Sequence, residues 1–286
     1  MKTSTEISSS RKIVGAEKAI EYIAKAGFDA WDFSMCNMIK YDWDNDIAKI
    51  ADIEVNGADY VKYAKKLKQI GLDNGIVCSQ SHAPFPVKNK VIRDTIKRSI
   101  ECTAIAGGEI CVVHPDNNKS AEENAEMYLE LLPFAKDHGV KIATENMWNW
   151  KDGFPCPAAC SSPEDFKKHV DVVNDPYLVA CVDIGHAEMK GAETSAVEVI
   201  KALGHRVQAL HIHDNDKIWD SHQIPFSMNI DFAPIVKALK EIDYKGYFTL
   251  ECDNYIPSGA DEETVKRKLK DLSNVVKKLA TDFENL

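Results

Sequence analysis

The sequence predicts an α/β protein that folds as a single closed (β/α)8 barrel over residues 1–286. Short apolar segments rich in Val, Ile and Phe, which are typical of buried parallel strands, alternate with segments of helical periodicity. No linker-like stretch divides the 286 residues, and barrels of this class commonly reach that length. An open, doubly wound sheet is the alternative, but no Gly-rich phosphate loop follows the first strand segment.

Eight segments are expected to form the strands of this barrel. Most of them are short apolar runs, as the strands of a parallel sheet with both faces covered should be. The expected strands are residues 2–8, 28–33, 76–81, 109–114, 140–145, 178–183, 207–213 and 246–251.

The segments between these strands show the pattern of amphipathic helices. Clear apolar stripes, with an apolar residue every three or four positions, run through residues 121–135 and 265–279. Ser162 followed by Pro163 is expected to open a helix. Three glycines are expected to close helices: Gly27, Gly71 and Gly139. Two longer inserts interrupt the alternation, residues 35–59 and 147–161.

Composition and charge favour a cytoplasmic protein without membrane or nucleic-acid partners. The net charge of −10 and the pI near 5.4 repel a polyanion, so general nucleic-acid binding is disfavoured. No apolar stretch approaches the roughly 20 residues that span a bilayer, and the first residues, "MKTSTEISSSRK", lack the apolar core of a signal peptide. The eight cysteines are expected to be reduced and structural, because most lie inside apolar segments.

Polar side chains end six of the eight expected strands. In chain order these residues are His82, His114, Glu145, Asp183, His211 and Glu251, and His186 lies just beyond Asp183. The carboxyl ends of the strands of a (β/α)8 barrel meet at one face, and such barrels carry their catalytic residues there. The pattern therefore predicts that these side chains converge on one site.

Small residues are expected directly beneath four of these side chains. Because side chains alternate along a strand, the residue two positions earlier points in the same direction. Beneath Glu145, Asp183, His211 and Glu251 these residues are Ala143, Cys181, Ala209 and Thr249. An ordinary barrel layer is filled by bulky branched side chains, so this layer leaves room for a bound ion.

Three carboxylates that face one another without a counter-charge would be strongly destabilising. Basic residues of the strand segments, such as Lys141, lie near the opposite end. A divalent cation resolves this conflict, and three carboxylates with one imidazole suit Mn²⁺, Mg²⁺ or Co²⁺, with Zn²⁺ as an alternative. Unrelated polar strand ends are the other interpretation, but four converging residues favour the metal site.

A second polar stretch follows His211 directly. The segment "LHIHDNDKIWDSH", residues 210–222, holds three of the nine histidines of the chain, interleaved with aspartates. It is either a solvated loop or the end of a strand that brings ligands to a metal. His213 shares the inward direction of His211 but lies one step above it, so we expect it to contact a ligand or the substrate rather than the metal.

The ordered motifs resemble those of the xylose-isomerase-like TIM barrels, which include sugar isomerases and epimerases together with endonuclease IV. The resemblance covers nearly the whole chain, and its motifs are "SHAPF", "VVHP", "TEN", "VDIGHA", "LHIHDND", "DSH", "IDF" and "TLEC". It implies that one catalytic metal is held by Glu145, Asp183, His211 and Glu251. It also implies that His186 binds and polarises the substrate.

The resemblance to endonuclease IV implies a larger set of ligands, because that enzyme holds three zinc ions. The residues that match one outer ion are His82 and His114. Those that match the other are His186, Asp220 and His222. If these side chains hold no outer ions, we expect His82, His114 and His222 to contact the substrate.

The first functional hypothesis is an isomerase or epimerase of a sugar, a sugar derivative or a cyclic polyol. A metal that chelates the carbonyl oxygen and the neighbouring hydroxyl oxygen acidifies the hydrogen on the carbon beside the carbonyl. Glu145 would remove that proton and Glu251 would return it, with a cis-enediolate between the two steps. By resemblance, the same machinery also serves dehydratases of inosose-like substrates.

The second hypothesis is an endonuclease IV-like phosphodiesterase that acts on abasic DNA with up to three zinc ions. The complete set of matching ligands favours it. The acidic charge and the scarcity of arginine disfavour it, because contacts to phosphates need cations. The loop at residues 35–57 carries more acid than base and suits closure over a small polar ligand better than a grip on DNA. The isomerase is therefore favoured, and a count of bound metal ions separates the two.

Other side chains have smaller predicted roles. Trp148 and Trp150 could stack on a sugar ring or shield the intermediate from water, with packing in the outer layer as the alternative. Asn146 could position a substrate hydroxyl. The remaining polar residues considered are expected to be solvated: His138, His169 and Lys217.

One departure from the family pattern leaves a placement open. Many relatives have a glycine-rich turn before the "IDF" segment, whereas this chain reads "IPFSMNIDF" without a glycine. The backbone must therefore take a different path there, so the positions of Asp220 and His222 are not determined by the resemblance. Exposed apolar faces of the outer helices would allow pairing into a homo-oligomer.

Overall fold

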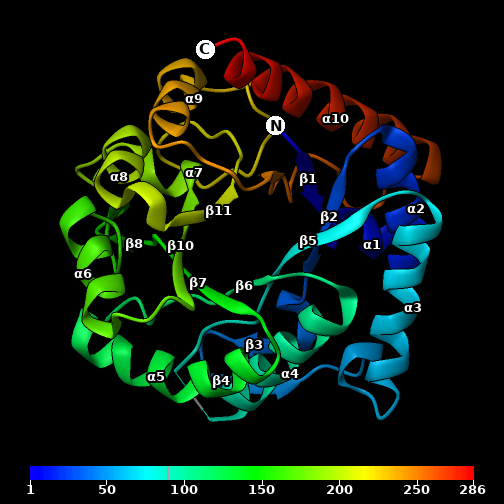
Figure 1. The fold of residues 1–286 in the computed structure, drawn as a ribbon, viewed down its shortest axis with the longest axis horizontal. Coiled ribbons are helices and arrows are strands. Elements are labelled where there is room, and N and C mark those ends of the chain that lie inside the picture. Colours follow the sequence, from blue (N-terminus) through cyan, green and yellow to red (C-terminus); the bar gives the residue numbers. More distant parts are fainter. Residues whose placement is uncertain (89) are drawn as a thin grey trace.

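Eight parallel strands surround the centre of the molecule and helices cover them on the outside, which confirms the predicted barrel (Figure 1). The computed structural model describes residues 1–88 and 90–286. The barrel strands are β1 (Thr3–Glu6), β2 (Ala30–Ser34), β5 (Val77–His82), β6 (Ile110–Val112), β7 (Lys141–Glu145), β10 (Leu178–Asp183), β11 (Val207–His211) and β12 (Phe248–Leu250).

The two ends of this sheet meet, so that the barrel closes. The strand order is β11-β10-β7-β6-β5-β2-β1-β12, and a parallel bridge pairs Ile212 with Leu250. The Ile212 N–H donates to the Thr249 carbonyl at 2.9 Å, and the Glu251 N–H donates to the Ile212 carbonyl at 3.1 Å. The seam of the barrel therefore lies between β11 and β12, and β12 pairs on its other side with β1.

The helices lie outside the barrel with their apolar stripes inward. Both predicted stripes are buried, one on α5 from Ala121 to Ala135 and one on α10 from Val265 to Leu279. The helices are α1 (Ser8–Val14), α2 (Ala16–Ala26), α3 (Tyr60–Asp73), α4 (Lys90–Ala106), α5 (Ala121–Asp137), α6 (Pro163–Val173), α7 (Ile184–Ala187), α8 (Ala196–Leu203), α9 (Phe232–Glu241) and α10 (Glu262–Glu284). None of the described helices combines the length and apolarity that crossing a membrane requires.

Most of the predicted helix ends agree with the structure. The Ser162 hydroxyl accepts the Asp165 N–H at 3.1 Å, so it caps α6 directly before Pro163. Gly27 ends α2 in the left-handed conformation. The prediction for Gly71 is wrong, because α3 continues to Asp73. A Cβ atom at Gly71 would lie 2.9 Å from the Trp31 indole nitrogen, so glycine allows the helix to approach the strand closely.

Four expected strands extend beyond the carboxyl ends of the observed ones, and the eighth strand ends at Leu250. The first ends at Glu6, and α1 begins at Ser8. The seventh ends at His211 rather than at 213, and the fourth ends at Val112. In each case the chain leaves the sheet as soon as it reaches the carboxyl end of the barrel.

Both predicted inserts form antiparallel hairpins at this level. The first insert contains η1 (Cys36–Met38), β3 (Ile39–Asp42), β4 (Ile47–Ile50) and η2 (Glu54–Asn56). The second contains β8 (Trp148–Lys151) and β9 (Phe154–Pro157). The remaining short helix, η3 (Gly204–Arg206), precedes β11.

The barrel interior has its own small apolar cluster, separate from the larger clusters between strands and helices. It consists of Val112, Ala143, Val179, Cys181 and Ala209. Thr249, like Ala143, Cys181 and Ala209, is fully buried. The predicted layer of small side chains is therefore present beneath the polar strand ends. All eight cysteines lie in the described residues and are free thiols, as expected.

Candidate active site

Four side chains from neighbouring strands meet at the carboxyl end of the barrel. They are Glu145, Asp183, His211 and Glu251, and each offers one atom within 4.8 Å of the others. Glu145, Asp183 and His211 close strands β7, β10 and β11, and Glu251 directly follows β12. Asp183 and His211 are also in register across the β10–β11 pair. The structure therefore brings together the four residues that the sequence pattern selected.

His211 lies between the two glutamates of this group. Its Nδ1 atom is 3.1 Å from the Glu145 Oε1 atom and 3.5 Å from the Glu251 Oε2 atom. Asp183 is held from the other side, because its Oδ1 atom accepts the His186 N–H at 2.6 Å and lies 3.1 Å from His213 Nε2. His213 thus contacts Asp183.

His82 and His114 approach Glu145 from strands β5 and β6. Their Nε2 atoms are 2.9 Å apart, and His114 Nε2 lies 3.2 Å from the Glu145 Oε2 atom. The same oxygen is 3.6 Å from His82 Nε2. Cys36, which sequence reasoning had not selected, contacts His82 from the other side at 3.0 Å.

Asp220 and His222 join His186 in spite of the missing glycines. The Asp220 Oδ2 atom lies 3.1 Å from His186 Nε2 and 3.0 Å from His222 Nε2. The rings of His213 and His222 stack with their centroids 4.0 Å apart. The backbone of this loop takes positive φ angles at His222 and Phe226, a conformation that glycine adopts more readily than residues with a side chain.

The carboxylate of Asp214 holds this loop in place. It accepts the N–H groups of Met228 at 2.8 Å and Ile230 at 3.0 Å, and the Asp214 backbone pairs with Gln223. These contacts fix the backbone at residues 228–230, in the segment "IPFSMNIDF".

The donor atoms of the site fit a divalent cation. Five buried carboxylate oxygens lack a hydrogen-bond partner among the described residues, and three of them belong to candidate metal ligands: Glu145 Oε2, Asp183 Oδ2 and Asp220 Oδ1. A buried oxygen without a partner is costly, and a metal ion would supply the missing contact. The sets of side chains with suitably close donor atoms include the four strand-end residues, His82 with His114 and Glu145, and His186 with His213, Asp220 and His222.

The protein's own charges act differently on the two glutamates. Burial opposes the ionised form of Glu145, but His211 and His114 outweigh it and hold the pKa of this carboxyl well below its usual range. Burial raises the pKa of Glu251, and His211 only partly offsets this effect. Burial also lowers the pKa of His114 to about 4, whereas Asp183 and Asp220 outweigh burial and raise that of His186 to about 10. Neighbouring titratable groups with such opposed pKa values are typical of acid–base sites.

Two further acids lie at this end of the barrel, and sequence reasoning missed both. Asp32 in β2 is 1% exposed, and burial raises its pKa to about 7. Glu6 at the end of β1 is 3% exposed, and burial, followed by the charge of Asp253, raises its pKa to about 8. The signal for Asp32 was an acidic residue in the middle of the apolar strand "AWDFS".

Trp148, Trp150 and Asn146 lie in the segment that follows Glu145. Trp148 lies at the rim, where its indole N–H donates to Asp220 at 3.3 Å, and Trp150 stacks on Trp219. Asn146 uses its amide to bond the N–H and carbonyl of Asp183, so it supports this strand end rather than reaching a substrate.

The expectation that three polar residues are solvated is wrong in part. His169 is 1% exposed, because its ring is held between the Asn124 amide and the Asp165 carbonyl. His138 is half-buried and bonds the Phe134 carbonyl. Lys217 is also half-buried and pairs with Glu188 at 2.9 Å.

A cavity of about 230 Å³ adjoins the site at His114. Trp43, Phe85 and Met147 form part of its apolar wall, and the Phe85 ring stacks on that of His114 with the centroids 4.7 Å apart. Its lining also includes the side chains of Asn117, Asn118 and Asn149. The hairpin of the first insert and the loop after β5 thus build a pocket next to Glu145.

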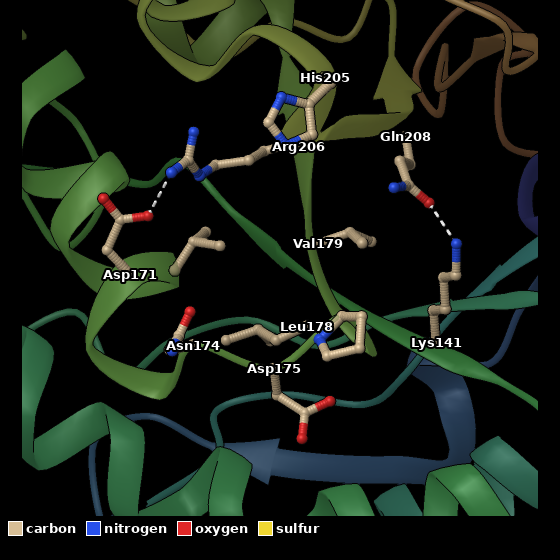
Figure 2. A pocket seen from close by; sticks show the side chains of 11 residues that line it. Lys141, Asp171, Asn174, Asp175, Leu178, Val179, His205, Arg206 and Gln208 are labelled. Carbon is tan, nitrogen blue, oxygen red and sulfur yellow. Dashed lines mark hydrogen bonds and ion pairs between the residues drawn. The ribbon is translucent and has the colours of Figure 1, made fainter.

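A larger cavity, of about 410 Å³, lies at the opposite end of the barrel (Figure 2). It contains none of the predicted site residues. Lys141, the first residue of β7, donates to the Gln208 side chain there at 2.7 Å, and Arg206 pairs with Asp171 at 2.6 Å (Figure 2). Lys141 is therefore remote from the carboxylates, as predicted.

Comparison with known proteins gives matches along most of the chain. The model of the xylose isomerase-like TIM barrel family matches residues 20–274. An uncharacterized protein of Methanocaldococcus jannaschii is 27% identical over 270 residues, which cover 88% of this chain and 84% of that protein. An L-ribulose 3-epimerase of Methylomonas sp. is 24% identical over 249 residues, covering 83% of this chain and 78% of the epimerase.

Among solved structures, a D-tagatose 3-epimerase-like protein has a similar fold, with a TM-score of 0.72. The match covers 98% of this chain and 99% of the other, at 22% sequence identity. At that identity the match supports the fold, and the two relatives above supply the likeness in sequence.

Proposed function

The chain belongs to the xylose isomerase-like TIM barrel family, and from that premise we propose that it is a metal-dependent isomerase or epimerase of a sugar, a sugar derivative or a cyclic polyol. One observation carries this proposal. Glu145 and Glu251 reach the same small volume from β7 and β12, with an oxygen of each within 4.8 Å of the other. Such a reaction needs two proton-transfer groups around one substrate carbon or two adjacent carbons.

The metal would be held by Glu145, Asp183, His211 and Glu251. Their unpartnered buried oxygens support this assignment, and Mn²⁺, Mg²⁺, Co²⁺ and Zn²⁺ all accept such a ligand set. A divalent cation bound there would withdraw electron density from the substrate carbonyl and acidify the neighbouring C–H group.

Glu145 is proposed to remove the proton beside the carbonyl. Its low pKa favours the ionised form that a base needs, and His211 and His114 are the groups that lower it. The electron pair of the broken C–H bond moves into a cis-enediolate of the substrate. Glu251, whose pKa is raised, then delivers a proton to the same carbon in an epimerase or to the neighbouring carbon in an isomerase.

The surrounding histidines and Trp148 are proposed to bind the substrate. His186 would donate to the reacting oxygens, because its raised pKa keeps the ring protonated. His82, His114 and His222 lie on either side of the same centre. Trp148 lies at the rim, where its ring would shield the enediolate from water.

The cavity beside His114 suits the uncharged part of a sugar. Its one lysine, Lys88, is already paired with Asp46 at 2.5 Å and lies over the Tyr41 ring. Trp43 and Phe85 offer faces for the C–H groups of a sugar, and asparagine amides offer partners for its hydroxyls. We therefore propose a small polyhydroxylated substrate rather than a phosphate ester.

A phosphodiesterase with three metal ions is the second candidate. It is favoured by the close approach of His82 to His114 and of His186 to Asp220 and His222, because these are the additional ligands that such an enzyme would use. The net charge of −10 opposes binding to DNA. Metal analysis of the purified protein separates the candidates, since the isomerase needs one tightly held ion and the phosphodiesterase needs three zinc ions.

Exchange of the substrate hydrogen with solvent tests the proposed function. The protein is incubated in deuterium oxide with Mn²⁺, Mg²⁺, Co²⁺ or Zn²⁺, and in each case separately with L-ribulose, D-tagatose, D-fructose and an inosose. Proton NMR is expected to show deuterium entering the carbon beside the carbonyl of at least one of them. Glu145→Gln should slow this exchange by about 10²- to 10⁴-fold, the usual contribution of a positioned base.

Two further variants complete this experiment. Glu251→Gln should retain exchange for the epimer whose hydrogen faces Glu145 but should not convert it into the other epimer. Glu122→Gln, an exposed acid on α5, is the control and should behave like the unaltered protein. The proposal is wrong if none of the four compounds exchanges with any of the four metals, or if Glu145→Gln exchanges at the normal rate.

A further inference from the structure

Asp32 lies behind His211, on the side away from the glutamates. The Asp32 Oδ2 atom is 4.0 Å from His211 Nε2, whereas His211 Nδ1 faces Glu145 and Glu251. Among the described residues, Asp32 is the one carboxylate within 4.0 Å of this nitrogen. Its Oδ1 atom is buried without a hydrogen-bond partner.

An imidazole that binds a metal through one nitrogen carries its proton on the other. The proton then needs an acceptor, which fixes the orientation of the ring and strengthens its bond to the metal. For His211 the metal-facing atom is Nδ1, so the proton belongs on Nε2, directed at Asp32. The Cys181 thiol also lies beside this ring, but a neutral thiol is a weak acceptor, and burial raises its pKa to about 12.

The cost of placing Asp32 in the barrel supports a role beyond folding. A carboxyl that is 1% exposed and has an unpartnered oxygen destabilises the fold, and the Gln80 amide nitrogen nearby is likewise buried without a partner. A neutral side chain of the same shape would avoid this cost. The residue is therefore better explained by what it does to His211 than by what it contributes to packing.

We propose that Asp32 is a positioning residue of the metal site: its carboxylate, 4.0 Å from His211 Nε2, favours the proton on that nitrogen and so leaves Nδ1 for the ion. This inference rests on the metal site of the proposed function and not on the identity of the substrate. The carboxyl would act through the imidazole, without touching the substrate or the ion.

Metal affinity and stability together test the role of Asp32. In Asp32→Asn, isothermal titration with Mn²⁺ should give a dissociation constant raised by about 10- to 100-fold, the usual effect of removing such a carboxylate. The melting temperature of the same variant in EDTA should equal or exceed that of the unaltered protein, because a buried charge has been removed. A purely structural role predicts the reverse, with lower stability in EDTA and unchanged affinity.

Asp29→Asn is the matched control. Asp29 directly precedes β2, is exposed, and bonds Thr3 at the opposite end of the barrel. Its substitution should leave Mn²⁺ affinity unchanged. The inference is overturned if Asp32→Asn binds Mn²⁺ as tightly as the unaltered protein. If the unaltered protein binds none of the four metals, the proposed function fails instead, so the two failures are distinguishable.

If Asp32→Asn does not fold, Asp32→Ser is tested instead, because it replaces the carboxylate by a smaller polar group. The same outcomes apply to it: a weakened affinity supports the inference, and an unchanged affinity overturns it.

Discussion

Glu145 and Glu251 are identical side chains whose neighbours push their pKa values in opposite directions. Glu145 has His114 and His211 within 3.2 Å, and these rings favour its ionised form. Glu251 has His211 and His222 at 3.5 and 3.8 Å, and burial dominates its pKa. The pKa values of the two glutamates are therefore shifted in opposite directions, which distinguishes a candidate base from a candidate acid.

Glu6 should make the protein less stable as the pH rises. Its pKa is about 8 in the folded chain against an ordinary value of 4.5, so between these values the unfolded chain is ionised while the folded chain holds a proton. Unfolding then releases a proton, and stability falls from about pH 4.5 to about pH 8 by an amount on the order of a few kcal/mol. Urea unfolding in EDTA at pH 5 and pH 8 should show this loss.

Glu6→Gln should reduce the difference in stability between the two pH values. The amide can still accept the N–H of Ser9, which donates to Glu6 at 3.0 Å, so the local contact is preserved. Glu17→Gln on α2, a surface substitution, is the control. Equal pH dependence in Glu6→Gln and the unaltered protein would show that the carboxyl of Glu6 is ionised in both states.

At the scale of elements, the β3–β4 hairpin forms part of the wall of the cavity beside His114. Lys88 fastens this hairpin to the loop after β5 through Asp46 and the Tyr41 ring. Trp43 is thereby held over the cavity although its side chain is 65% exposed. Such an exposed ring has room to cover one face of a ligand.

Trp43→Ala should weaken substrate binding without slowing the chemical step. We expect KM to rise by about 5-fold, because an exposed aromatic contact contributes on the order of 1 kcal/mol beyond its buried area, while kcat changes little. Steady-state kinetics on the ketose that shows the fastest exchange measure both values. Ile47→Ala, on β4 but outside the cavity lining, should change neither. A fall in kcat at constant KM would contradict the assigned role.

The helices and strands could be predicted from the sequence because each depends on a local, repeating pattern of residues. The stripe of α10 and the cap at Ser162 are local signals, and both agree with the structure. Gly71 was misinterpreted because its function is a contact with Trp31, which lies 40 residues earlier in the chain. His169 was misjudged for the same reason, since the partner that buries it, Asn124, belongs to another helix.

The residues of the candidate site could be predicted where they lie at the end of a strand. They could not be predicted where they lie in the interior of a strand. Glu145 and Asp183 end apolar runs, so their position alone predicted that they converge. Asp32 lies inside β2, and the pattern of a buried strand gives no reason for an acid there. Only the distance to His211 assigns it a partner.

At the scale of the whole molecule, we expect the proposed metal ion to stabilise this acidic chain. With a net charge of −10 and several carboxyls converging on one end, the folded chain repels itself. Addition of Mn²⁺ at about 100 times its dissociation constant should stabilise the fold by about 2.7 kcal/mol. For a chain of this size that corresponds to a rise of roughly 5 to 10 °C in Tm over the EDTA-treated protein.

Scanning calorimetry with and without Mn²⁺ measures this rise, and Asp183→Asn should reduce it. Glu241→Gln, at the C-terminal end of α9 and paired with Lys201, changes the net charge by the same amount away from the barrel mouth and should preserve it. If neither Mn²⁺ nor EDTA changes the Tm, the protein does not bind Mn²⁺ in the way that the proposed function requires.

The position of the seam between β11 and β12 also determines when the barrel can close during synthesis. β1 leaves the ribosome first, yet its neighbour β12 is the last strand to be made. A nascent chain that stops before residue 248 lacks both the closing strand and Glu251. In such a chain β11, which ends at His211, has no partner strand on one side. The four residues of the proposed metal site can therefore come together only after β12 has been made, and a chain that ends before it is expected to lack the proposed activity.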